Sequence, residues 1–305
     1  MKKDLLKLTD LSREEITHIL DVADQLKYDQ KHGIPHKVLE GKTLGMIFQK
    51  SSTRTRVSFE VGMFQLGGHA LFLSTSDIQM GRGEPIRDTA RVLSRYCDGI
   101  MIRTYGQDEV EELAEYASIP VINGLTDYAH PCQVLADLMT IREKMSTLEG
   151  LHMCYIGDGN NMANSLIAGG LIMGMKVSCA TPAGYKPDPQ ILEFTKQYGD
   201  NFHWCEDIME ASRGADILVT DVWASMGQES EREERAKIFK EYQISDKVMQ
   251  NANENAIVMH CLPAHRGEEI TEEVFEKYAD VIFDEAENRL HAQKAVMAIY
   301  MGNIE

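Results

Sequence analysis

The sequence has no apolar run near the roughly 18 residues that suggest a membrane span. It also lacks an apolar signal core, because the first residues lead into a mixture of acidic and basic side chains. The composition, 43% hydrophobic and 26% charged, is in the globular range. These features predict a soluble, cytoplasmic protein without a membrane partner.

Cysteine pairs of the CxxC type are also missing, which argues against a disulfide framework or a zinc site and favours reduced thiols. Positive charge is scarce, and the formal net charge is −17. This balance argues against a nucleic-acid partner, since phosphate backbones bind to basic faces. It favours the approach of a cationic substrate, and a phosphorylated small molecule can still bind where arginines are concentrated.

The 305 residues are enough for about two domains. Short apolar runs alternate with helical patterns, which predicts parallel sheets with helices on both faces. The expected strands are residues 44–48, 69–73, 99–103, 120–123, 152–156, 176–180, 201–204, 217–220, 257–260 and 281–283. A turn-like segment at 146–150 separates the domains. The prediction is a two-domain α/β fold with an interdomain cleft, comprising residues 1–145, residues 146–287, and a C-terminal helix over 288–305 that packs back on the first domain.

Residues 51–56, with the sequence Ser-Ser-Thr-Arg-Thr-Arg, lie between an expected strand and an expected helix. Hydroxyls, free backbone N–H groups and the positive end of a helix converge there, which predicts an anion pocket. Arg54 and Arg56 cannot share a helix face, and we expect Arg54 to hold the anion. The alternative is a capped, solvated helix start with surface arginines. No G-x-x-x-x-G-K-[ST] nucleotide loop is present.

The element Gly157-Asp158-Gly159-Asn160-Asn161 also follows an expected strand and opens a helix. It resembles a dinucleotide-binding turn, but Met162 replaces the third glycine and no acidic residue ends the next strand. The sequence therefore predicts no nicotinamide cofactor.

Four motifs occur in the order seen in one known family. They are Ser52-Thr53-Arg54-Thr55-Arg56, His130-Pro131-Cys132-Gln133, Asp221 followed by Ser225-Met226-Gly227, and His260-Cys261-Leu262-Pro263. Together they resemble the aspartate and ornithine carbamoyltransferases, and the last two resemble the ornithine branch. The resemblance extends from about Leu5 to the last helix. It implies transfer of a carbamoyl group from carbamoyl phosphate to the side-chain amine of L-ornithine, giving L-citrulline and phosphate.

The resemblance also implies the donor site. Its residues would be Ser52, Thr53, Arg54, Thr55, Gln79, Arg103, His130, Gln133, Cys261, Leu262 and Arg289. Arg54, Arg103, His130 and Cys261 would be the catalytic ones. Taken singly, Arg103 at a strand end or a lone His130 is more often structural. Gln79 would enter the site of a neighbouring subunit, which implies a homotrimer or a multiple of it. The aspartate branch has a lysine in that loop, and residues 77–84 contain none.

By the same resemblance, Asn161, Asp221, Ser225 and Met226 would bind ornithine, with Gly227 allowing a bend. Cys261 and the carbonyl of Leu262 would orient the amine, although a buried cysteine is more often a packing residue. No metal or cofactor is implied. The main alternative acceptor is putrescine, which the intact Ser-Met-Gly loop and paired asparagines disfavour. A nucleotide-dependent oxidoreductase and a noncatalytic binding paralogue are alternatives of other classes.

Overall fold

The computed structural model describes residues 3–224 and 229–302, and its chain forms two compact units. The first unit comprises Met1–Leu135 and Arg289–Glu305, and the second comprises Ala136–Asn288. The division falls within two helices, α5 (Pro131–Met145) and α12 (Ala279–Gly302). Each unit is described by itself below.

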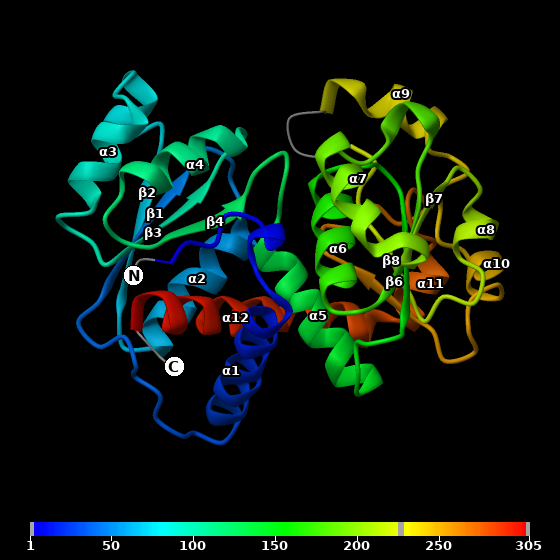
Figure 1. Cartoon of the computed structure of the whole chain (residues 1–305), viewed down its shortest axis with the longest axis horizontal. Coiled ribbons are helices and arrows are strands. Elements are labelled where there is room, and N and C mark those ends of the chain that lie inside the picture. Colours follow the sequence, from blue (N-terminus) through cyan, green and yellow to red (C-terminus); the bar gives the residue numbers. More distant parts are fainter. Residues whose placement is uncertain (1–2, 225–228, 303–305) are drawn as a thin grey trace. The chain divides into compact units, whose positions relative to one another are not determined.

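The first unit is built on a parallel sheet of four strands in the order β2-β1-β3-β4. The strands are β1 (Thr43–Phe48), β2 (His69–Ser74), β3 (Gly99–Arg103) and β4 (Val121–Leu125), and the helices are α1 (Arg13–Lys31), α2 (Thr53–Gln65), α3 (Ile86–Leu93) and α4 (Gln107–Tyr116). Within this unit, α3 and α4 cover one face of the sheet, and α2 and the end of α12 lie on the other (Figure 1). Strand side chains alternate between the two faces. Ile100 and Ile102 accordingly pack in the α3/α4 core, while Gly99 lies against Met301 of α12.

Local signals explain where these helices begin and end. Ser12 caps α1 in a reciprocal capping box with Glu15, and the side chain of Ser52 accepts the N–H of Thr55 to cap α2. Gly67, with a φ of 83°, allows the chain to turn after α2. The start of α2 is thereby held directly after the carboxyl end of β1.

The second unit contains a parallel sheet of five strands in the order β7-β6-β5-β8-β9. The strands are β5 (His152–Ile156), β6 (Lys176–Ala180), β7 (Phe202–Cys205), β8 (Ile217–Thr220) and β9 (Ile257–His260), and the helices are α6 (Asn161–Ile172), α7 (Pro189–Thr195), α8 (Ile208–Ala211), α9 (Arg232–Ile238), α10 (Asp246–Met249) and α11 (Glu272–Lys277). Met153 of β5 faces α6, where it lies near Gly170. Cys154 and Ile156 face the opposite core, which includes Phe239, Val248 and Val274.

The predicted fold class, two α/β domains with parallel sheets, is confirmed. One predicted strand is wrong: residues 281–283 belong to α12. The side chains of Ile282 and Glu285 are buried while Phe283 is exposed, and Asn288 and Arg289 continue the buried face. This is the spacing of a helix, so α12 begins at Ala279 rather than near Asn288. Among the described residues, no helix is long and apolar enough to cross a membrane.

Candidate functional site

In the first unit, polar side chains converge on the hydroxyl of Thr55 at the start of α2. The Ser52 hydroxyl donates to Thr55 Oγ1 at 3.1 Å. Arg103 Nη1 and Arg289 Nη2 each lie 3.4 Å from the same oxygen. The first turn of α2 contains no acidic residue, so its amide groups and dipole favour an anion. The local charge is therefore positive in a chain whose net charge is strongly negative.

Two further buried side chains complete this group. Arg289 Nη1 donates to Gln133 Oε1 at 2.6 Å. His130, at the start of α5, is also buried. We call Ser52, Thr55, Arg103, His130, Gln133 and Arg289 the arginine cluster. Its members come from α2, β3, α5 and α12, so tertiary structure alone brings them together.

The environment of His130 keeps its imidazole neutral. Burial lowers the pKa of His130 well below its usual value, and the positive charges of Arg289, Arg103 and Arg54 lower it further. A neutral imidazole can donate one hydrogen bond to a polarised oxygen without adding a positive charge. The influence of Arg54 on this pKa also indicates that Arg54 lies near the arginine cluster.

Three other residues that were predicted to bind the phosphorylated donor are more exposed than the arginine cluster. Arg54 and Thr53 are exposed in the first turn of α2. Arg56 instead pairs with Glu60 at 2.9 Å, and its guanidinium lies 3.8 Å from the centre of the Phe72 ring. Arg56 therefore makes contacts within the fold. Gln79 is exposed in a 3₁₀ turn, Gln79–Arg82.

In the second unit, polar side chains surround the carboxylate of Asp221. Asn160 caps α6 and donates from Nδ2 to Asp221 Oδ2 at 2.9 Å. The other oxygen, Oδ1, accepts the N–H of Val222 at 2.8 Å and the thiol of Cys261 at 3.2 Å. We call Asn160, Asp221 and Cys261 the carboxylate cluster. Asp221 is thereby held buried with a fixed orientation.

The thiol of Cys261 is protonated in this environment. Burial raises the pKa of Cys261 well above its usual value, and the neighbouring carboxylates of Asp221 and Glu285 raise it further. Since the thiolate is the nucleophilic form of cysteine, this residue is suited to donating a hydrogen bond and not to attacking a substrate. Cys261 directly follows β9, whose last residue, His260, pairs with buried Glu269 at 2.9 Å.

Buried contacts also support the turn between β5 and α6. Asp158 pairs with Arg235 of α9 at 2.7 Å, and Arg235 Nη1 also donates to the carbonyl of Trp223 at 2.8 Å. A Cβ on Gly159 would lie 2.2 Å from the backbone of Lys186, so only glycine fits there. Asn161 begins α6 directly after this turn.

Of the residues predicted to bind ornithine or orient its amine, Asp221 and Cys261 lie in the carboxylate cluster and Asn161 is adjacent to it in sequence, whereas two supporting residues were not predicted. The capping role of Asn160 could have been found, since asparagine before a helical run is a common cap. Arg235 lies in a run of glutamates and arginines that resembles an exposed helix face, so its buried ion pair gave no local signal. The predicted Ser225, Met226 and Gly227 lie outside the described residues.

Comparison with known proteins matches each half of the chain to a family model. Residues 3–143 match the carbamoyl-P binding domain of aspartate/ornithine carbamoyltransferase, and residues 149–300 match its Asp/Orn binding domain. An ornithine carbamoyltransferase of Syntrophotalea carbinolica is 58% identical over 301 residues, which cover 99% of this chain and 100% of that protein.

Solved structures agree. The ornithine carbamoyltransferase of Pyrococcus furiosus has a TM-score of 0.95 at 54% identity, covering 100% of this chain and 98% of that one. The anabolic ornithine carbamoyltransferase of Campylobacter jejuni has a TM-score of 0.92 at 44% identity, covering 99% and 100%.

Proposed function

The chain belongs to the aspartate/ornithine carbamoyltransferase family, and we propose that it transfers the carbamoyl group of carbamoyl phosphate to the side-chain amine of L-ornithine. The products are L-citrulline and phosphate. The observation that carries this proposal is the pair of oppositely charged clusters, one in each unit: guanidinium groups around Thr55 and a fixed carboxylate at Asp221.

In the first unit, the N-terminus of α2 and Arg54 would hold the phosphate, with Ser52, Thr53 and Thr55 as hydroxyl and amide donors. Arginine suits this task because it is always protonated and donates in pairs. Arg103, Thr55 and neutral His130 would address the carbonyl oxygen, where negative charge builds as the amine attacks. Gln133, held by Arg289, would accept from the carbamoyl amide. The arginine cluster would thus stabilise both the leaving phosphate and the tetrahedral intermediate.

In the second unit, Asp221 would pair with the α-ammonium group of ornithine, and Asn161 would contact its main-chain groups. The fixed Asp221 carboxylate supports this role, since Asn160 and the Val222 amide hold both of its oxygens. Ser225 and Met226 are proposed to contact the same substrate. A diamine such as putrescine would leave these groups without partners, which favours the amino acid.

The attacking nitrogen must first lose a proton, because a lysine-like amine has a pKa of about 10. A bond then forms from this nitrogen to the carbonyl carbon, the carbon–oxygen bond to phosphate breaks, and the nitrogen gives a second proton to the departing phosphate. The protonated Cys261 thiol and the Leu262 carbonyl would orient the amine, and Cys261 forms no bond to the substrate. These two residues would also contact the carbamoyl group. The proposed steps call for no cofactor or metal.

We also propose that the protein acts in the cytoplasm in arginine metabolism, as a homotrimer or a multiple of it. Exposed Gln79 would enter the donor site of a neighbouring subunit. Sedimentation of the unaltered protein tests this assembly, and mixing Gln79→Ala with Arg54→Ala chains tests the shared site. Because each parent variant lacks a different residue, some sites of the mixed trimers would be complete, and we expect activity to reappear on mixing.

The direct test of function is a parallel assay with carbamoyl phosphate and four acceptors: ornithine, putrescine, aspartate and acetylornithine. We expect citrulline from ornithine as the main product, identified by mass. If putrescine were carbamoylated faster than ornithine, the proposed acceptor would be wrong. If none of the four acceptors were carbamoylated, the proposed function would be refuted.

A further inference from the structure

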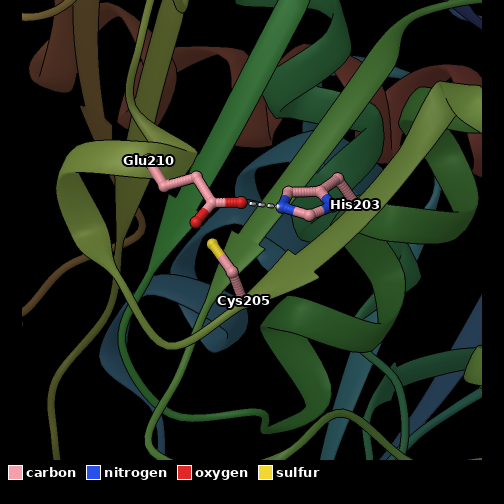
Figure 2. A group of neighbouring side chains, drawn as sticks. All are labelled: His203, Cys205 and Glu210. Atoms are coloured by element: carbon pink, nitrogen blue, oxygen red, sulfur yellow. Dashed lines mark hydrogen bonds and ion pairs between the residues drawn. The ribbon is translucent and has the colours of Figure 1, made fainter.

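Strand β7 and helix α8 bring together three side chains with metal-binding atoms: His203, Cys205 and Glu210 (Figure 2). Residues two apart in a strand face the same side, so His203 and Cys205 point in one direction. The chain then turns through Glu206 and Asp207 into α8, and Glu210 reaches back toward the strand. The cluster lies on β7 at the edge of the five-stranded sheet, where β6 and β5 separate it from β8 and β9, the strands that precede Asp221 and Cys261.

The atoms are close enough to share one ion. One atom from each of the three side chains lies within 4.8 Å of the others, and His203 Nε2 is 2.7 Å from Glu210 Oε1. Ligand atoms around a tetrahedral zinc ion are about 3.3 to 3.6 Å apart, given its usual bond lengths. A zinc ion therefore requires the His203–Glu210 pair to widen by less than about 1 Å, and the Cys205 sulfur, within 4.8 Å of both, to approach by at most about 1.3 Å. Both side chains are just over half exposed, at 55% and 56%, so they can rotate and an ion can reach them.

The backbone under the cluster is already ordered. Cys205 pairs in register with Ala180 of β6, and its thiol donates to the carbonyl of Asp207 at 3.3 Å. The side chain of Asp207 caps α8 by accepting the amides of Met209 and Glu210, at 2.8 and 3.3 Å. This capping fixes the start of the helix that carries Glu210. An ion would therefore order side chains and not the chain itself.

We propose that His203, Cys205 and Glu210 form a zinc-binding site, with solvent as the fourth ligand. Sulfur, imidazole and carboxylate together suit Zn²⁺ better than Mg²⁺ or Ca²⁺, which prefer oxygen ligands. Zinc binding replaces the thiol proton, so one thiolate and one carboxylate balance the two charges of the ion. The exposed Glu206 and Asp207 add negative charge that attracts cations.

A second cluster, His265, Glu268 and Glu269, is less suited to an ion. It has no sulfur ligand. Glu269 Oε1 already accepts from His260 Nε2 at 2.9 Å and from the His265 amide at 2.6 Å, so these bonds hold the loop after β9. This second cluster provides an internal control.

The test titrates metal-free protein with Co²⁺ alone and then adds Zn²⁺ as a competitor. Co²⁺ bound to a thiolate gives a ligand-to-metal charge-transfer band that oxygen and nitrogen ligands do not give. We expect one Co²⁺ per chain with this band, displaced by Zn²⁺. His203→Ala and Glu210→Gln, both at exposed positions, should weaken Co²⁺ binding at least about tenfold. Cys205→Ser should abolish the band while leaving carbamoyl transfer unchanged.

The controls are Cys261→Ser and His265→Ala, which should retain the band and the affinity of the unaltered protein. The proposal is overturned if the unaltered protein gives no thiolate band, if the band persists in Cys205→Ser, or if His203→Ala and Glu210→Gln bind Co²⁺ as tightly as the unaltered chain. Far-ultraviolet circular dichroism verifies that each variant is folded. Because the metal signal is independent of turnover, these results stand whether or not the protein transfers carbamoyl groups.

Discussion

Both units place a polar turn after a central strand of a parallel sheet and begin a helix there, at Thr53 in α2 and at Asn161 in α6. The two turns carry opposite charge. Arg103 and Arg289 approach the first turn, whereas the Asp221 carboxylate approaches the second. The strand–turn–helix scaffold therefore supplies a position, and residues from other elements decide which ligand the position suits.

The same contrast appears in the protonation of the two clusters. Burial lowers the pKa of His130 and raises the pKa of Cys261; nearby arginines add to the first shift and nearby carboxylates to the second. Both residues are therefore neutral near pH 7, although the charges around them are opposite. Each can donate a hydrogen bond, one in a positive and the other in a negative environment.

The largest expected effect comes from removing a charge at the first turn. Arg54→Ala should lower kcat by about 10³-fold, because it removes charge stabilisation of the leaving phosphate. Circular dichroism should be unchanged, since the Arg54 side chain is exposed. Steady-state kinetics gives the measurement, and Arg56→Ala is the matched control two residues away, for which we expect a much smaller loss. Normal turnover in Arg54→Ala would contradict the assignment.

The next largest effect is expected in ornithine binding, when the carboxylate at the second turn is removed. Asp221→Ala should raise the KM for ornithine about 100-fold and leave the KM for carbamoyl phosphate within about threefold, because a charge pair to the α-ammonium is lost. Initial rates with each substrate varied in turn measure both constants. Equal increases would show that the two clusters do not divide the substrates between them.

A third prediction concerns His130 and acid stability. Its pKa in the folded protein lies well below that of the unfolded chain, about 6.5, so the unfolded chain gains a proton first as the pH falls. The contribution of neutral His130 to the free energy of unfolding is fully present above about pH 6.5. Below that pH it is lost at up to about 1.4 kcal/mol per pH unit.

His130→Asn should therefore show a shallower loss of unfolding free energy between about pH 6.5 and 5, measured by urea titration. His152, whose pKa is also lowered, is present in both proteins and cancels in the difference. Parallel curves would mean that His130 titrates normally in the folded protein.

The smallest effect is expected at Cys261. Cys261→Ser keeps a hydrogen-bond donor beside Asp221, so kcat should fall less than about tenfold and the pH profile should keep its shape. Cys261→Ala, which removes the donor, should lose more. A complete loss of activity in Cys261→Ser would point to a covalent role for the sulfur.

Local patterns predicted much of the fold and suggested where to look for a site. Short apolar runs indicated the nine strands of the described residues, and the hydroxyl and arginine residues at the start of α2 led to the expectation of an anion site. Residues 281–283 were predicted wrongly because three apolar residues fit either a strand or a buried helix turn.

Contacts between distant residues could not be predicted from local patterns. Arg289 and Thr55 are 234 positions apart, and Arg235 and Asp158 are 77 apart. Only family resemblance pointed to Arg289, and nothing pointed to Arg235. Likewise, a search for CxxC pairs does not detect the cluster of His203, Cys205 and Glu210. Two of its residues are two positions apart on one face of a strand, and the third lies on a helix.

In the proposed function the first unit binds the phosphorylated donor and the second binds the diamino acid. This division is tested by calorimetric titration of the unaltered protein and of the Arg54→Ala and Asp221→Ala variants with an unreactive phosphonate analogue of carbamoyl phosphate. We expect Asp221→Ala to bind the analogue within about threefold of the unaltered protein and Arg54→Ala to bind at least about 100-fold more weakly, a difference of about 2.7 kcal/mol. Equal affinity in the two variants would contradict this division of the substrates between the units.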